Sequence, residues 1–378
     1  MEKIAASLLA TAGIACAQTY NYDSSSETLV ITGKGNTVAD RITPEEPITP
    51  GSTVPGTSEI FGDTKEIILK DVWTSPDSIR IKYVEPTSEG NNTTLKLENS
   101  RLGASGDFDK GGTGLILILD SQSRLDLFGN RLTNTIRIEN QGHISCSNST
   151  VRENSYLWDN KTTTGSSGVL GGSGYYRFGN VSSIETDKDF GLIKTSGQIT
   201  DLEISGIYNV DGNSAKTIGD DAYIVGVNTS SSSDGQAMTI SGSLTIEAKQ
   251  GTGIGILANQ LGSDDVSLKN DYSGQIYVTA KDAFGVKVGK NAAKDPSAAG
   301  DIYSLSVGGL DINNTITSGS TQGEATGIYA KSVKRDLTAD AITVEGYISA
   351  TGIHLTEGGR NRTISDMQVS ARNATATA

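Results

Sequence analysis

Cysteine and histidine are scarce in this sequence, which holds only two of each among 378 residues. A disulfide framework needs an even set of cysteines, and a structural zinc site needs about four Cys or His ligands held close together. Cys16 and His354 lie far along the chain from the pair His143 and Cys146. The sequence therefore predicts no disulfide scaffold, no metal site and no cofactor, and stability has to come from a packed core.

Basic residues are also fewer than acidic ones. The chain has 31 Lys and Arg and 44 Asp and Glu, so its formal net charge is −13. No basic stretch is longer than the pair Lys334 and Arg335. Proteins that bind nucleic acids or anionic membranes need a basic stripe to meet phosphate groups. Neither partner is expected here.

Proline is rare, and four of the seven prolines fall between Pro44 and Pro55. Proline removes a backbone donor, so this stretch is predicted to be an extended linker. Other tracts alternate apolar and polar residues over short runs, such as 78–84 and 243–248, which is typical of strands. No helical stripe follows residue 17. We expect an all-β mature chain, with a cap and a Pro/Thr-rich linker over 18–60 and a repetitive domain over 61–378.

The N-terminal segment predicts export. Lys3 is followed by an apolar stretch of about eleven residues, too short to span a bilayer, and then by Ala15-Cys16-Ala17. This arrangement is typical of a secretory signal peptide over residues 1–17, cleaved between Ala17 and Gln18. Lipidation at Cys16 and a buried first helix are the alternatives. We expect the chain to reach the cell surface, the outer membrane or the medium.

A repeated phrase in the second half decides between a β-sandwich and a solenoid. Each copy places a glycine after a small or apolar residue and before a β-branched residue or Leu, and the copies are 25 to 42 residues apart. Units of this size cannot bury an apolar face alone, whereas stacked units form one continuous core. The six phrase glycines are Gly191, Gly226, Gly255, Gly285, Gly327 and Gly352.

The solenoid reading makes specific predictions about size and core. With about 20–25 residues per coil and a rise of about 4.8 Å, residues 60–378 would form about 13–16 coils and a rod of about 60–75 Å. An antiparallel sandwich with chance repeats is the alternative. Six apolar residues are predicted to face the interior, namely Ile246, Val278, Val286, Ile328, Val344 and Ile353.

The phrases at 323–330 and 347–355 carry a family resemblance. In Ala325-Thr326-Gly327-Ile328-Tyr329-Ala330 and Ala350-Thr351-Gly352-Ile353-His354-Leu355, the sequence resembles the passenger region of bacterial autotransporters. The resemblance covers about residues 185–378 clearly and 60–180 in style only. It implies a right-handed parallel β-helix, signal-peptide export in a Gram-negative bacterium, and display on the outer membrane, commonly for adhesion.

The resemblance has one departure. Autotransporters carry a C-terminal translocator barrel, and this chain stops at Ala378 without the strands of such a barrel. We therefore expect a passenger truncated at its C-terminal end, or one whose barrel lies elsewhere. The implied partner is a ligand on a host or bacterial surface, either a glycan or a protein.

A search for chemistry finds no G-x-S-x-G elbow and no phosphate-binding loop that leads into a helix. The acidic pairs at 107/109, 220/221 and 264/265 are predicted to be solvated loop charges. His354 is expected to face solvent, as are Tyr329 and Lys287, which occupy the same position in other copies of the phrase. Cys146 is expected to be half-buried. We predict no catalysis, with a secreted polysaccharide lyase or glycoside hydrolase as the alternative.

The densest candidate contact patch lies between two glycines, and it consists of Tyr175, Tyr176, Arg177 and Phe178. Trp73 and Trp158 occupy loop-like contexts. Exposed aromatic side chains and arginines are frequent anchors of partners, although aromatic residues more often cover the edge of a core.

Overall fold

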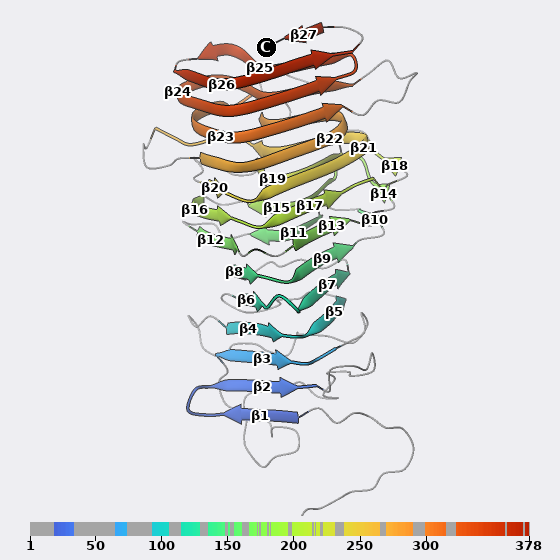
Figure 1. Cartoon of the computed structure of the whole chain (residues 1–378), viewed down its shortest axis with the longest axis vertical. Helices are drawn as coiled ribbons and strands as arrows, with labels where there is room; N and C mark the ends of the chain where they lie inside the picture. The colour runs from blue at the N-terminus through green and yellow to red at the C-terminus, as the bar shows by residue number, and fades with distance from the viewer. Residues whose placement is uncertain are drawn as a thin grey trace, which may run out of the picture.

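The computed structural model describes residues 19–33, 65–73, 93–105, 115–128 and 135–147, and most of 150–377 with gaps that include 231–237, 265–269, 290–298 and 315–322. Every regular element in these ranges is a β-strand. Figure 1 shows the strands stacked along the long axis, from the N-terminal strands at one end to the C-terminal strands at the other. The prediction of an all-β parallel β-helix is confirmed, and an antiparallel sandwich is excluded.

Three faces run along the rod, and each is a parallel sheet in which strands of successive coils are hydrogen-bonded. The first face contains β2 (Thr28–Thr32), β3 (Glu66–Lys70), β4 (Thr93–Glu98), β6 (Leu115–Leu119), β8 (Thr135–Asn140), β12 (Ser166–Gly171), β16 (Ile199–Ile204), β20 (Met238–Ile240) and parts of β22 (Asn270–Val288), β23 (Asp301–Asn314), β24 (Glu324–Gly346) and β26 (Arg362–Ala371).

The second face follows the first after a short corner. It contains β5 (Arg101–Ser105), β7 (Arg124–Phe128), β9 (His143–Ser147), β13 (Tyr175–Gly179), β17 (Ile207–Asp211) and parts of β21 (Ser243–Ala258), β22, β23, β24 and β26. The third face contains β11 (Ser155–Asn160), β15 (Asp189–Thr195), β19 (Tyr223–Thr229), parts of β21, β22 and β24, β25 (Ser349–Gly359) and β27 (Thr375–Thr377). A small parallel sheet of β10 (Thr150–Val151), β14 (Ser183–Ile184) and β18 (Thr217–Ile218) lies between the second and third faces in chain order.

The coils are longer and fewer than predicted. One step between rungs of the first face takes 21 residues from Ile116 to Arg137, but 36 residues from Glu203 to Thr239. From β3 to β26, the described first face has eleven rungs, which give a rod of about 48 Å at a rise of about 4.8 Å. The expectation of about 20–25 residues per coil holds for the steps from β4 to β6 and from β6 to β8. It is wrong for most later coils, because these include a third face and its connecting loops, and there the spacing of the phrase glycines is itself one coil.

The interior consists of apolar rows that run through successive coils. Ile246, Val278 and Val344 belong to one row on the second face, and each is fully buried. On the third face Val286 pairs with Ile328, which pairs with Ile353. Five of the six predicted interior residues are fully buried. Ile353 is partly buried because β27 pairs only with Ser349, Ala350 and Thr351 of its strand.

Five of the phrase glycines also form a row, which we call the glycine ladder and which consists of Gly226, Gly255, Gly285, Gly327 and Gly352. A Cβ atom on Gly285 would lie 2.6 Å from the carbonyl oxygen of Gly327 and 2.9 Å from Cδ1 of Ile312. Phe284 faces outward and Val286 faces inward, so the alternation of the strand changes phase at the glycine. The backbone bends here because only glycine permits this close approach.

Gly191 does not belong to the glycine ladder. It pairs with Tyr156 and Val225, one position out of register, and a Cβ atom on Gly191 would lie 2.7 Å from the ring of Tyr156. The sequence around Gly191 resembles the other five copies of the phrase, but its glycine does not align with theirs in the sheet. Here the glycine makes room for an aromatic side chain of the preceding coil.

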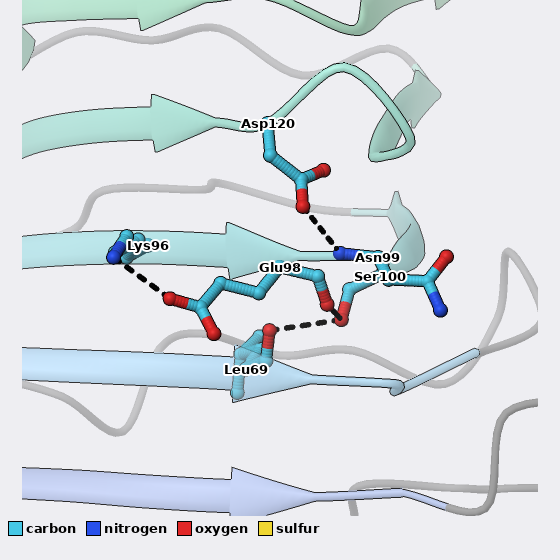
Figure 2. Close-up of polar contacts among 6 residues, drawn as sticks. All are labelled: Leu69, Lys96, Glu98, Asn99, Ser100 and Asp120. Atoms are coloured by element: carbon cyan, nitrogen blue, oxygen red, sulfur yellow. Dashed lines mark hydrogen bonds and ion pairs between the residues drawn. The ribbon is translucent and has the colours of Figure 1, made fainter.

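Polar side chains shape the corner between the first and second faces in the N-terminal coils (Figure 2). Ser100 is fully buried, and its Oγ accepts a hydrogen bond of 3.1 Å from the N–H of Val72. The same hydroxyl lies 2.9 Å from the carbonyl oxygens of Leu69 and Glu98 and can donate to either. Asn99 has a positive φ of 45°, a conformation that Asn tolerates, and its N–H donates to Asp120 Oδ2 at 2.9 Å. Each coil thus satisfies backbone groups of its neighbour.

The two ends of the rod differ. β1 (Thr19–Asp23) pairs antiparallel with β2, so a hairpin closes the N-terminal end, and β2 already stacks in parallel on β3. The predicted linker 44–55 and the predicted strand 78–84 lie outside the described residues. At the other end, the interior residues Ile364, Met367 and Val369 are only partly buried.

The row through Ile328 and Ile353 allows a matched test of the fold. We expect Ile328→Asp to lower the free energy of unfolding by about 3–5 kcal/mol, because it places an unpaired charge in a fully buried site. Ile353→Asp should have a clearly smaller effect, since that side chain is partly buried. Urea unfolding followed by circular dichroism measures both, and equal effects would contradict the assigned interior.

The glycine ladder gives a second test. Gly285→Ala should lower the free energy of unfolding by about 1–3 kcal/mol, because its Cβ would meet a backbone oxygen that cannot move away. Gly179→Ala is the control, since its nearest contacts are at 3.2 Å and a small shift relieves them. If both variants unfold at the same denaturant concentration as the parent, the ladder does not constrain the coils.

Candidate functional site

The outer side of the second face carries the most distinctive row of side chains. Alternation sends every second residue outward, and parallel register aligns these residues from coil to coil. At the start of the strands the aligned residues are consecutive Cα partners, and we call them the arginine–aromatic row: Trp73, Arg101, Arg124, His143, Tyr175 and Ile207. They come from six coils and are separated by up to 134 residues in the sequence.

Two pairs of neighbouring side chains in this row are in contact. The Arg101 guanidinium carbon lies 4.3 Å from the centre of the Trp73 ring, within the range of a cation–π interaction. The rings of His143 and Tyr175 are 5.1 Å apart with an interplanar angle of 47°. Side chains from successive coils in this row therefore not only align but also, in these two pairs, contact each other along the rod axis.

Ion pairs flank the row in the next outward positions. Arg124 Nε lies 2.7 Å from Asp126 Oδ2, and the hydroxyl of Ser145 donates to the other oxygen of Asp126. Arg177 Nη2 lies 3.0 Å from Asp211 Oδ2 on the adjacent coil. Exposed pairs such as these add at most about 1 kcal/mol to stability. Their main effect is to hold the planar guanidinium groups in place.

The second face also holds the exposed apolar side chains. Among the described residues, only Ile207 at 51% and Tyr277 at 37% are large hydrophobic residues with high exposure. Ile207 ends the arginine–aromatic row, and Tyr277 lies two coils further along the same face, between Thr245 and Asp311. The outer side of this face therefore combines exposed apolar residues with arginines held by ion pairs, and it is the candidate contact surface of the described residues.

The predicted contact patch was half wrong. Tyr175 and Arg177 face outward, but Tyr176 and Phe178 are fully buried, because the four residues alternate along β13. The Tyr176 ring stacks on Tyr208 with centroids 4.6 Å apart. Phe178 stacks on Phe190 at 4.2 Å. These two aromatic residues fill the core, and their burial excludes direct contact with a partner.

Of the two tryptophans, Trp158 differs from its predicted loop context, whereas Trp73 lies outside the named strands. Trp158 is fully buried in β11 of the third face. Trp73 forms a bridge to Arg101, and its Nε1–H donates to the carbonyl oxygen of Asn99 at 3.4 Å. No local pattern in the sequence indicates that Trp73 begins an outer row, since its neighbours in that row lie on later coils.

The outer side of the third face is partly covered. His354 is exposed as predicted, but Tyr329 and Lys287, its partners in the same row, are buried. The Lys287 ammonium lies 4.8 Å from the Phe284 ring and 5.1 Å from the Tyr223 ring. This burial is explained by a second hydrophobic cluster that lies outside the main core and includes Tyr223, Phe284 and Tyr329. The prediction that Lys287 and Tyr329 face solvent is therefore wrong.

Burial and charge lower the pKa of His143 below its ordinary value. Burial is the larger cause, the cations Arg124 and Arg177 act in the same direction, and the Asp126 carboxylate opposes them. The imidazole is therefore neutral near pH 7. The positive charge of the row at that pH comes from its arginines.

Some of the predicted residues lie outside the described part of the chain. The cleavage residues Ala17 and Gln18 and the acidic pairs at 107/109 and 220/221 lie outside the described residues. Cys146 occupies a register position between Leu127 and Phe178. Within the part of the chain that the structure describes, no cluster of His, Cys, Asp and Glu is suited to a metal ion. A search of the same residues for a helix long and apolar enough to cross a membrane finds none.

Comparisons with known proteins give no match: no family model, no curated protein and no solved structure is significantly similar to the chain.

The environment of His143 yields a prediction that NMR can check. We expect His143 to titrate below 6.5, and Arg124→Gln to raise its pKa by removing a nearby cation. Because the folded pKa lies below the unfolded one, the stability linked to His143 is complete above pH 6.5 and is lost as the pH falls. His354→Gln assigns the two imidazole signals, and a pKa of 6.5 or higher for His143 would contradict this environment.

Proposed function

We propose that this chain is an exported β-solenoid that makes contact with a ligand on a host or bacterial surface, in the manner of an autotransporter-like passenger. The observation that carries the proposal is the arginine–aromatic row, which ends at the exposed Ile207 and shares its face with the exposed Tyr277. The signal-like N-terminus and the phrases around Gly327 and Gly352 support export and display.

The rigidity of the sheet favours binding. Each residue of the row projects from a strand that is hydrogen-bonded to strands of the neighbouring coils, so little backbone entropy is lost when a ligand binds. Trp, Tyr and Arg are the residue types most often found at binding hot spots. A surface of this kind can bind an extended ligand over several coils.

The charges on this face favour contact over catalysis. A glycoside hydrolase needs two carboxyl groups that flank the scissile bond, one of them able to donate a proton. Asp126 and Asp211 are each paired with an arginine, and their strands lie three rungs apart on the second face, about 14 Å at about 4.8 Å per rung, which is wider than such a pair of carboxyl groups requires. We therefore propose a non-catalytic role. If the chain were found to cleave a polysaccharide, the enzyme alternative would replace this proposal.

A surface-display experiment tests the proposal. The chain is fused ahead of an autotransporter translocator in a Gram-negative host, and adhesion to cultured cells and to other bacteria is measured. We expect Trp73→Ala/Tyr175→Ala/Ile207→Ser to reduce adhesion at least about fivefold, since it removes the anchors of the row.

The control variant is Thr343→Ala/Gln368→Ala/Ser370→Ala, which changes outward residues of the same face on the last two coils, away from the row and from Tyr277. Surface protease accessibility has to be equal for all variants. Equal adhesion of both variants would refute a role for the row, and turnover of a polysaccharide by the purified chain would establish the enzyme instead.

A further inference from the structure

The chemistry of the arginine–aromatic row narrows the class of ligand. The Arg101 guanidinium lies over one face of the Trp73 ring, and the rings of His143 and Tyr175 meet at an interplanar angle of 47°; these contacts leave ring edges and guanidinium N–H groups for a ligand. The edge of an aromatic ring is its positive part, and the donors of a guanidinium lie in its plane. The row therefore offers hydrogen-bond donors and positive edges, which favours anionic oxygen atoms.

The local charge agrees with this reading. Arg101, Arg124 and Arg177 lie on three different coils of a chain whose net charge is −13. The ion pair of Arg124 with Asp126 uses Nε, so its two terminal nitrogens are not part of that bond. Among the described residues, no carboxylate lies within ion-pair distance of Arg101. These three arginines outnumber the two carboxylates that pair with them.

The carboxylates of Asp126 and Asp211 add a second requirement. They are acceptors, so a ligand that covers them has to supply donors as well as anionic groups. A polysaccharide with carboxylate or sulfate groups supplies both, because its hydroxyl groups donate hydrogen bonds. A DNA backbone supplies no such donors, and its dense charge is repelled by the acidic remainder of the chain.

The geometry sets the direction of the ligand. The row presents one side chain per coil, so its six residues extend over about 24 Å at the rung spacing of about 4.8 Å. A linear polysaccharide advances by roughly one such spacing for each sugar ring. We propose that the row binds an anionic polysaccharide laid along the rod axis, an inference that rests on the proposed contact function and names its ligand.

Binding of defined polymers to the purified full chain tests this proposal. Immobilised dextran sulfate and polygalacturonate are the sulfated and carboxylated probes, dextran is the neutral polymer, and polyglutamate is the acidic peptide. At 0.15 M salt we expect binding to at least one of the two anionic polysaccharides and none to dextran, with affinity falling as salt rises.

The decisive variant is Arg101→Gln/Arg124→Gln, which should weaken binding at least about tenfold, since it removes two charge-assisted donors. Its control, Arg362→Gln/Arg372→Gln, changes net charge equally at exposed sites in the last coil, and binding should change less than about twofold. Arg101→Lys/Arg124→Lys keeps the charge but not the planar stacking, and it should give an intermediate loss. Circular dichroism confirms that each variant folds.

Four results would overturn the proposal: equal losses in the two Gln variants, binding of dextran as tight as that of the anionic polymers, tighter binding of polyglutamate, or no binding of either anionic polysaccharide. None of these results depends on the adhesion experiment. If the Trp73/Tyr175/Ile207 variant still reduces adhesion as expected while the anionic polysaccharides fail to bind, the contact function stands and its ligand belongs to another class.

Discussion

The close approach of backbone to backbone at the glycine ladder is the constraint on which the C-terminal half of the rod depends. A Cβ atom at Gly226, Gly255 or Gly327 would collide with the carbonyl oxygen of the next glycine. It would also collide with an apolar side chain of the second face, such as Leu244 or Ile276. Because these glycines have no side chain, the apolar side chains of the second face can fill the interior next to them. The same close contacts fix the register of the third-face strands relative to the second face.

The same register creates the rows on the outside. A coil that stacks in order to align Leu125, Ile144 and Tyr176 in the core necessarily aligns Arg124, His143 and Tyr175 on the surface. The inner residues are limited by packing, whereas the outer ones contribute little to stability. Outer rows can therefore specialise in binding without loss of the fold, which is how a solenoid core supports a contact surface.

The sequence was sufficient to predict strands, interior residues and stacking, because all of these follow from local alternation and from repetition of one phrase. It could not predict coil length, since the loops that set it have no pattern. Tyr176 and Phe178 were misassigned because a cluster of aromatic residues conceals the alternation within it. The burial of Lys287 depends on an outer cluster that only tertiary structure reveals. The arginine–aromatic row depends on register between distant coils, which no local pattern encodes.

A row of single side chains on a rigid rod has an energetic advantage for binding a repetitive ligand. The backbone is already ordered, so association loses mainly side-chain freedom, about 0.5–1.5 kcal/mol for each long side chain that becomes fixed. The stacking of Arg101 on Trp73 and the ion pair of Arg124 with Asp126 have already restricted two of these side chains. Each further coil adds one contact at the same spacing, so affinity for a linear polymer grows with the number of rungs engaged while each single contact remains weak and exchangeable.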